Sequence, residues 1–135
     1  MPEEKQAENQ QLGINYYYET RILGYLNKAN HYRDERRFEE AIANYTKAIA
    51  LEQNVAYYVL RANCYKECEQ YQKAIADYNI AINLEPNPYY LMYREDCYKK
   101  LNQKRNNDSD TKDNVDTNLI LKPSKIKGYG RVVDF

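Results

Sequence analysis

Apolar positions recur along this chain with the period of an α-helix, and the pattern itself repeats at a fixed step of 33 residues. Between residues 39 and 51, the apolar side chains that share one face of a helix are Ala41, Ile42, Tyr45, Ala48 and Ile49. Between residues 72 and 84, the same offsets hold Ala74, Ile75, Tyr78, Ala81 and Ile82. A repeat of this length predicts stacked helical units, each of which buries its apolar face against the next.

The pattern predicts five helices joined by short connections. They cover residues 17–34, 38–51, 55–68, 71–84 and 88–101. Pro86 cannot continue a helix, whereas Asn87 can cap the next one and Pro88 suits its first turn. Because the connections are short, we expect consecutive helices to be antiparallel neighbours in an all-α fold.

The two ends of the chain differ from this helical region. Residues 1–16 form a polar N-terminal arm whose start is expected to be loose, and residues 17–101 hold the helical repeats. Residues 102–118 form a polar linker that is expected to be disordered, because it is too polar to bury a core. Residues 119–135 regain apolar side chains and are expected to form an extended tail that docks as a peptide. Its docking residues would be Leu119, Ile120, Leu121, Ile126, Tyr129, Val132, Val133 and Phe135.

Composition and charge narrow the range of functions. The chain has 135 residues, and its 20 lysines and arginines balance its 20 aspartates and glutamates, so the formal net charge is zero. Binding to nucleic acid needs clustered excess positive charge, which argues against nucleic acid as the main ligand. The N-terminus lacks the apolar segment of a signal peptide, and no apolar run approaches the ~20 residues that span a bilayer. Three cysteines without a disulfide framework indicate a reducing compartment, so we expect a cytoplasmic protein, with cytoskeletal or ciliary association as one setting.

Small and aromatic residues stand at set positions within each copy of the repeat. The second copy has Tyr58, Arg61, Ala62, Tyr65, Tyr71, Ala74, Tyr78, Ala81 and Pro86. The first copy has Tyr25, Ala29, Tyr32, Phe38, Ala41, Tyr45 and Ala48. This combination resembles the tetratricopeptide repeat, a helix–turn–helix unit usually of 34 residues. The resemblance implies an α-solenoid of about two and a half repeats with an extended C-terminal tail.

The resemblance covers residues 22–101 and departs from the family pattern in the turns and in the third copy. The family usually places glycine in the turn between paired helices, and this chain has Arg36, Glu69 and Asn102 there. The third copy has Glu95 where a small residue is expected, and its second helix is missing. Two full repeats and one helix fall short of the three units that stacked repeats usually need. We expect the array to be completed by the segment of Tyr16, Tyr17 and Tyr18, by the tail, by self-association or by a partner.

In tetratricopeptide proteins the first helix of each pair lines a concave groove that holds a protein segment. The resemblance places the groove residues of this chain at Leu26, Asn27, Asn30, Arg33, Val59, Leu60, Asn63, Lys66, Met92, Tyr93, Asp96 and Lys99. Asn30, Asn63 and Asp96 occupy equivalent positions one repeat apart. Asparagine both donates and accepts hydrogen bonds, so this row suits the backbone of an extended peptide. The alternative is that the row only satisfies neighbouring helix ends or water.

One subgroup of the family binds the acidic tails of chaperones through a clamp of lysines, asparagines and an arginine. Of the five clamp positions, only Asn30 fits here. The other four hold Leu26, Leu60, Tyr89 and Tyr93. We therefore expect no tight complex with a free acidic tail, and an apolar or aromatic ligand edge is favoured instead.

The sequence contains no recognisable constellation for catalysis. Cys64, Cys68 and Cys97 with His31 are the candidate zinc ligands, but their spacing matches no known metal pattern. We interpret Cys64 and Cys97 as packing residues one repeat apart, and His31, which precedes them in the same register, as a packing residue too. We therefore predict that the protein is not an enzyme. We also expect that it binds no metal, no cofactor and no small-molecule substrate.

The sequence favours a non-catalytic adaptor that binds an extended or helical protein segment in its groove, within a larger assembly. The alternative is a small structural subunit, built permanently into a ciliary, cytoskeletal or organellar complex and anchored by its C-terminal tail. A transient adaptor should fold alone, whereas a built-in subunit should be unstable without its neighbours.

Overall fold

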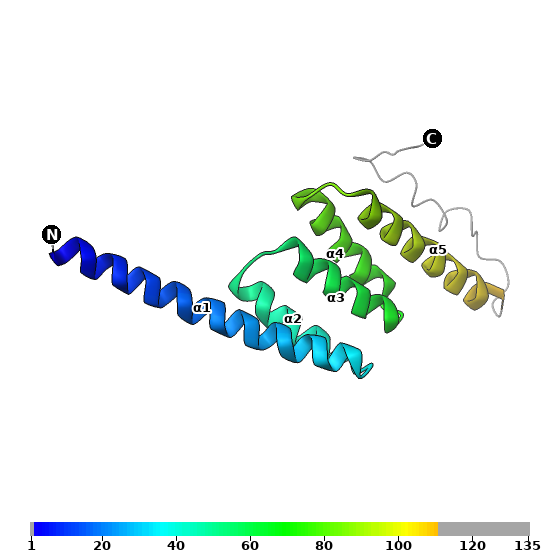
Figure 1. The fold of residues 1–135 in the computed structure, drawn as a ribbon. Helices are drawn as coiled ribbons and strands as arrows, with labels where there is room; N and C mark the ends of the chain where they lie inside the picture. The colour runs from blue at the N-terminus through cyan, green and yellow to red at the C-terminus, as the bar shows by residue number, and fades with distance from the viewer. Residues whose placement is uncertain (1, 111–135) are drawn as a thin grey trace.

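In a computed structural model, which describes residues 2–110, the chain forms five helices and no strand over that range. The helices are α1 (Pro2–Asp34), α2 (Phe38–Leu51), α3 (Val55–Glu67), α4 (Tyr71–Leu84) and α5 (Pro88–Asp110). Figure 1 shows α1 with α2 and α3 with α4 as two hairpin pairs, and α5 stacked on the second pair. The all-α repeat fold is confirmed, and α2, α3 and α4 start and end within one residue of their predicted bounds.

Both end helices are longer than predicted. α1 begins at Pro2 rather than at residue 17, so the N-terminal arm is helical and the expected loose start is wrong. This arm is rich in glutamate and glutamine, which favour a helix without forming an apolar pattern. α5 continues through residues 102–110, which were expected to be disordered, and no proline interrupts it after its first residue. The remaining linker, 111–118, and the docking tail, 119–135, lie outside the described residues.

Buried alanines set the close spacing of the paired helices. Six of them, at repeat positions, have no exposed surface: Ala29, Ala41, Ala48, Ala62, Ala74 and Ala81. Tyr45 and Tyr78 are also fully buried and fill the wider space beside these contacts. Each tyrosine is packed in a cluster that a cysteine from the next first helix completes, Cys64 for one cluster and Cys97 for the other. The two cores are therefore copies of each other, one repeat apart.

The turns within the two pairs share one strained geometry. Arg36 and Glu69 have φ values of 61° and 58°, in the left-handed region where the family usually has glycine. The residue after each of them donates its N–H back to the first helix, Arg37 to the Tyr32 carbonyl at 2.7 Å and Gln70 to the Tyr65 carbonyl at 2.9 Å. These bonds are those of a Schellman motif. The third turn position, Asn102, lies inside α5, which continues through it to Asp110.

Side-chain caps confirm the predicted starts of α3 and α5, the helices that follow the two pairs. The side chain of Asn87 accepts a hydrogen bond of 2.9 Å from the Tyr89 N–H, and Pro88 is the first residue of α5. Asn54 caps α3 in the same way, accepting from the Ala56 N–H at 2.9 Å. Each cap fixes where the chain re-enters a first helix.

Arginines at equivalent positions of α3 and α5 tie each first helix to the preceding repeat. Arg61 donates two hydrogen bonds to the Asp77 carboxylate, at 2.7 and 2.8 Å, and a third to Thr46 Oγ1 at 3.0 Å. One repeat later, Arg94 donates to Asn79 Oδ1 at 2.9 Å. Thr46 and Asn79 are themselves 33 residues apart, so the same contact recurs between successive units.

α5 is the last helix of the described residues, and it has a polar side chain where α3 has a small one. Glu95 is exposed at the position that corresponds to the buried Ala62 of α3. A charged residue there opposes the close approach of a second helix. The segment of Tyr16, Tyr17 and Tyr18 does not complete the array, because it lies on the part of α1 that is exposed along its whole length.

The Arg61–Asp77 pair should be essential for stability. Their side chains are only 15% and 5% exposed, so replacing Arg61 by methionine leaves a carboxylate buried without its partner. We expect R61M to lower the free energy of unfolding by about 3 kcal/mol. The double variant R61M/D77M removes the orphaned charge and should recover most of that loss. Urea unfolding followed by circular dichroism measures both, and an R61M variant as stable as the natural chain would contradict the role of the pair.

Candidate protein-binding groove

The predicted groove residues lie on α1, α3 and α5, the first helix of each unit. Contacts connect these helices in order. Arg33 of α1 and Asn63 and Glu67 of α3 line a shared pocket of ≈ 240 Å³. From α3 to α5, Lys66 Nζ lies 2.7 Å from Asp96 Oδ2. The structure therefore places parts of the predicted set side by side.

Asn30 and Asn63 are held by tyrosines from the second helix of their own units. The Tyr45 hydroxyl donates to Asn30 Oδ1 at 2.6 Å, and the Tyr78 hydroxyl donates to Asn63 Oδ1. Arg33 Nη1 in turn donates to the Tyr45 hydroxyl at 3.2 Å. Because each amide oxygen accepts from a tyrosine, the NH₂ group is the end of the amide that remains to donate to a ligand.

These hydrogen bonds bear on both interpretations of the row of Asn30, Asn63 and Asp96, as peptide-binding residues or as residues that satisfy helix ends or water. Asn30 and Asn63 are half-buried, and they satisfy buried tyrosines rather than helix ends. Asp96, the third member, forms ion pairs with Lys66 at 2.7 Å and Lys100 at 3.5 Å. The hydrogen bond from Lys66 is the main reason that the pKa of Asp96 lies below its ordinary value. The row therefore offers two oriented amides and one neutralised carboxylate.

The apolar groove residues are partly used by the cores beneath them. Leu26 and Leu60 are half-buried against the cluster around Tyr45. Val59 and Tyr93 are half-buried against the cluster around Tyr78. The exposed sides of these four residues are what a ligand would contact. Three further members of the set stand apart and are exposed: Asn27, Met92 and Lys99.

The sequence analysis missed the tyrosines as positioning residues for the groove. A signal was present, because Asn30 precedes Tyr45 by 15 residues and Asn63 precedes Tyr78 by the same 15. A fully buried tyrosine hydroxyl needs a hydrogen-bond partner, and an amide on the paired helix at a constant separation is a natural candidate. The side-chain bond thus repeats with the fold.

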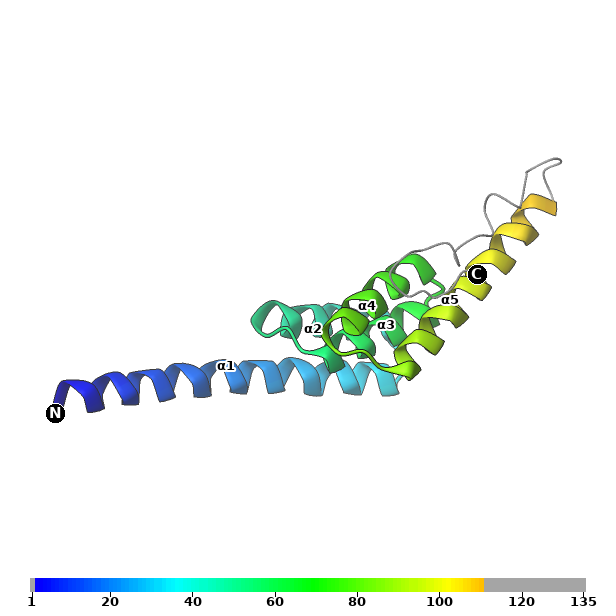
Figure 2. The same ribbon diagram turned by 90° about the horizontal axis from the view of Figure 1, so that it is seen from above.

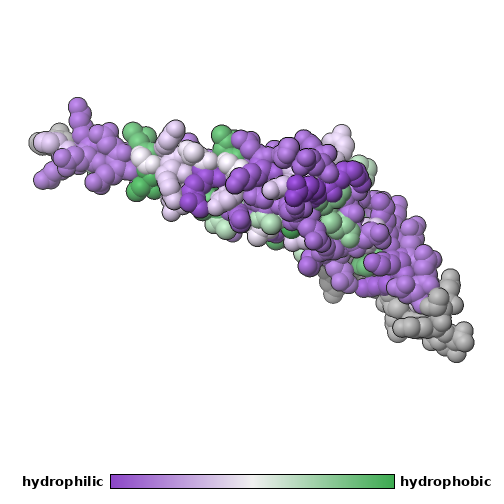
Figure 3. Space-filling model, turned by 90° about the horizontal axis from the view of Figure 1, so that it is seen from below, coloured by the Kyte–Doolittle hydropathy of each residue, from purple (hydrophilic) through white to green (hydrophobic). Residues whose placement is uncertain are grey.

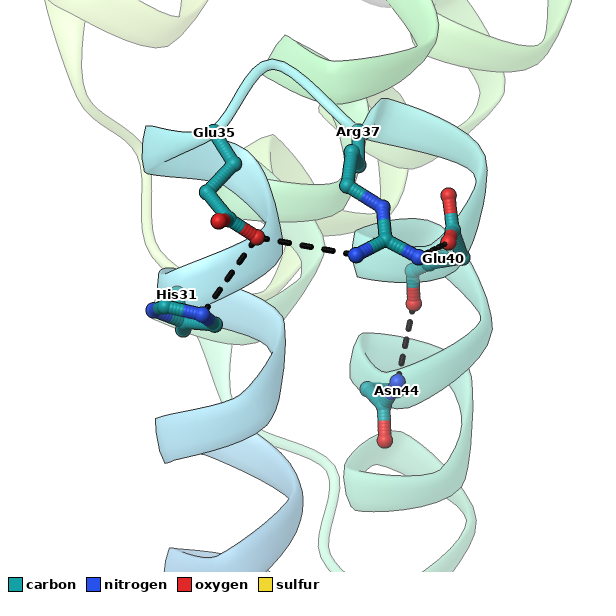
Figure 4. Close-up of polar contacts among 5 residues, drawn as sticks. All are labelled: His31, Glu35, Arg37, Glu40 and Asn44. Atoms are coloured by element: carbon teal, nitrogen blue, oxygen red, sulfur yellow. Dashed lines mark hydrogen bonds and ion pairs between the residues drawn. The ribbon is translucent and has the colours of Figure 1, made fainter.

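The turn between α1 and α2 carries a chain of polar contacts at one end of the groove-bearing helix (Figure 4). His31 Nε2 lies 3.3 Å from Glu35 Oε1, and the same oxygen lies 3.6 Å from Arg37 Nη1. Arg37 also donates to Glu40, whose backbone carbonyl accepts from Asn44 Nδ2 at 2.9 Å. These contacts fasten the turn. His31, Glu35 and Arg37 are exposed, whereas Asn44 of α2 is buried.

The packing interpretation is confirmed for two cysteines and is wrong for His31. Cys64 and Cys97 are buried free thiols, and burial raises the pKa of each to about 11. The His31 side chain is 70% exposed. Cys64 and Cys97 face the preceding second helix, whereas no helix of the described residues precedes α1, and the same register position is exposed there. Over residues 2–110, no group of three or more His, Cys, Asp and Glu side chains is placed to hold a metal ion.

The family model of the tetratricopeptide repeat matches the chain twice, at residues 24–55 and 55–88. The first match covers the second half of α1 together with α2, and the second match covers α3 and α4. The two units of residues 24–88 are therefore tetratricopeptide repeats. Such repeats generally mediate protein–protein interactions and are typically non-catalytic. No curated protein matches the chain.

Within the described range, none of the helices is both long and apolar enough to cross a bilayer.

Removing a tyrosine hydroxyl should weaken the fold and release the amide. Y78F deletes the donor to Asn63, so we expect a loss of about 1 kcal/mol in the free energy of unfolding and a more mobile Asn63 side chain. Y45F should behave alike through Asn30, with Arg33 also losing its acceptor. Chemical denaturation gives the free energy, and nuclear magnetic resonance of the side-chain amides reports their mobility. Unchanged amide signals in both variants would contradict the positioning role.

Alkaline pH should destabilise the protein through these same tyrosines. Burial raises the pKa of Tyr45 to about 12 and raises that of Tyr78 well above its ordinary value. The stability that comes from keeping them protonated is complete below their unfolded pKa of about 10, and it is lost as the pH rises towards the folded pKa. We therefore expect the free energy of unfolding to fall between about pH 10 and pH 12. Tyrosinate absorbance with circular dichroism tests this; both buried tyrosines ionising near pH 10 in a folded chain would contradict it.

Proposed function

We propose that this protein is an adaptor that binds a segment of another protein along the groove of α1, α3 and α5. The observation that carries the proposal is the repeated amide pair. Asn30 and Asn63 sit at equivalent positions, their oxygens bonded to Tyr45 and Tyr78, so their NH₂ groups are presented in the same way one repeat apart. Backbone carbonyls of an extended peptide are suitable acceptors for donors of this kind.

The surroundings of the amides favour an uncharged ligand. Leu26 and Leu60 expose apolar surface beside them. Of the basic side chains in the groove, Lys66 is paired with Asp96, and Arg33 contacts both the Tyr45 hydroxyl and Asp34, the latter at 3.5 Å. These cations are already partly neutralised, which supports the expectation that a free acidic tail binds poorly.

We also propose that the complex forms in the cytoplasm, as part of a larger assembly. Support comes from three cysteines that form no disulfide and from the short array, which leaves one face of α5 without a partner helix among the described residues. The alternative of a permanent subunit anchored by its tail depends on residues 119–135, outside the described range. No contact within residues 2–110 favours that alternative.

Site-specific photo-cross-linking tests the adaptor proposal in living cells. A photoreactive amino acid at exposed groove positions, Asn27 or Met92, should capture the same partner protein. Ala43 and Ala76 are the matched controls, because they are exposed one repeat apart on the second helices, α2 and α4. Capture of one common partner from both groove positions and from neither control is the expected result.

The amide contribution can then be measured with the captured partner. Asn63→Ala removes the oriented donor and should weaken binding about fivefold to tenfold, the usual effect of one hydrogen bond. Gln72→Ala, on the exposed surface of α4, is the control that should leave binding unchanged. Equal capture from groove and control positions, or unchanged binding by the Asn63→Ala variant, would refute the proposal.

A further inference from the structure

The first half of α1 projects from the helical array as an uncovered arm. From Pro2 to Arg21 every residue is exposed, and Ile22 is the first buried one. Figures 1 and 2 show this part of α1 extending beyond the end of α2, with no other helix beside it. At 1.5 Å per residue, the arm is about 30 Å long. A single helix of that length has little stability in water unless something packs against it.

The arm carries apolar side chains that the chain itself does not cover. Leu12, Ile14, Tyr16, Tyr17 and Tyr18 are between 46% and 72% exposed. Figure 3 shows apolar groups standing out on the projecting part of the molecule. Three of them, Ile14, Tyr17 and Tyr18, lie close together on one side of the helix, and apolar side chains gathered in this way mark a contact surface.

A shallow, open hollow on one side of the arm is a candidate socket for a second helix. It is ≈ 520 Å³ and is lined by Gln10, Gly13, Ile14, Tyr17 and Tyr18. Residues at i, i+3, i+4 and i+7 are the four that surround a knob in knobs-into-holes packing, and Gln10, Gly13, Ile14 and Tyr17 have that spacing. Gly13 opens the hollow: a Cβ there would meet no atom within 4 Å, so nothing inside the chain requires a glycine.

The stripe that contains this hollow is complementary to itself when reversed. With spacings of three and four residues, as in a coiled coil, it comprises Glu3, Ala7, Gln10, Ile14, Tyr17 and Arg21. In an antiparallel pair centred on residue 12, Glu3 faces Arg21 of the second copy, and Ala7 faces Tyr17. An acidic residue then faces a basic one, and a small residue faces a large one. Each of these pairs occurs twice, because the interface has two-fold symmetry.

We infer that two copies of this chain associate through their α1 arms as an antiparallel helix pair. In this register Ile14 of the second copy faces Gln10, which lines the hollow, so the occupant of the hollow is the Gln10–Ile14 segment of the second copy. Arg21 is already directed over this stripe, because it donates to the hydroxyls of Tyr17 at 2.9 Å and Tyr25 at 2.7 Å. The second arm would end near Ile22, where α2 begins to cover α1, so the two helical arrays lie at opposite ends of the pair. The contact is small, and dimerisation therefore depends on concentration.

Sedimentation velocity of the full chain over a range of concentrations tests the apolar part of this contact. The natural chain should shift from monomer towards dimer as its concentration rises. Ile14→Asp places a charge in the socket of both copies and should weaken the dimer at least about tenfold. Leu12→Asp is the matched control: Leu12 is exposed, at 65% against 49% for Ile14, but it lies on the opposite side of the helix, so this variant should leave the dimer unchanged. A chain that stays monomeric at every concentration, or one that both variants affect equally, would overturn the inference.

Charge reversal tests the antiparallel register specifically. Glu3→Arg puts like charges opposite each other in both ends of the dimer, and so does Arg21→Glu. Each should weaken self-association about threefold to tenfold at low salt. The double variant E3R/R21E should restore it, and a mixture of the two single variants should form a heterodimer. Weak association without recovery in either case would mean that another ligand covers the arm, and the inference would fail. The groove substitution Asn63→Ala should leave dimerisation unaffected, which separates this result from that of the proposed function.

Discussion

Paired helices in this protein touch through alanine side chains, and a larger side chain at any of these positions would push the helices apart. Ala62 and Ala74 are fully buried in one cluster, as Ala29 and Ala41 are in the other. An added methylene group in such a contact typically costs 1–3 kcal/mol. The narrow spacing also fixes where Tyr45 and Tyr78 can go, and it directs their hydroxyl groups to the first helices. The amide geometry of the groove is thus a consequence of how the cores are packed.

The packing of each helix against its neighbours also explains which parts of the fold were predictable from sequence. The bounds of α2, α3 and α4 follow from a repeating apolar pattern, because both sides of each helix pack against neighbours of the repeat. The turns at Arg36 and Glu69 keep the glycine-like conformation without glycine, so the repeat determines the backbone there rather than the residue type. His31 was misjudged because register alone does not reveal that a first helix at the start of an array lacks a neighbour.

The polar interactions were harder to predict, since they depend on side-chain direction rather than on period. The equal spacing of Asn30, Asn63 and Asp96 was visible in the sequence, but the side chains that contact them were not predicted. The two tyrosines that bond the asparagines belong to the apolar pattern and were counted only as core. Helical arms such as residues 2–21 escape a search for apolar faces, because good helix formers need no buried face to be helical.

The two outer helices of the described array, α1 and α5, therefore expose different kinds of surface. On α5, the last described helix, Glu95 replaces the small residue that a second helix would need, so this helix presents a polar side. At the start, α1 runs past the stack and exposes apolar side chains on its free half. By helical periodicity, Asn30 and the Ile14 stripe lie on different sides of α1, so pairing of the arms leaves the groove accessible. A paired molecule would present two grooves, joined by a rigid helical rod rather than by a flexible linker. Two grooves held in this way bind a partner with two copies of the recognised segment more tightly than either groove binds one copy, provided that the spacing of the copies matches.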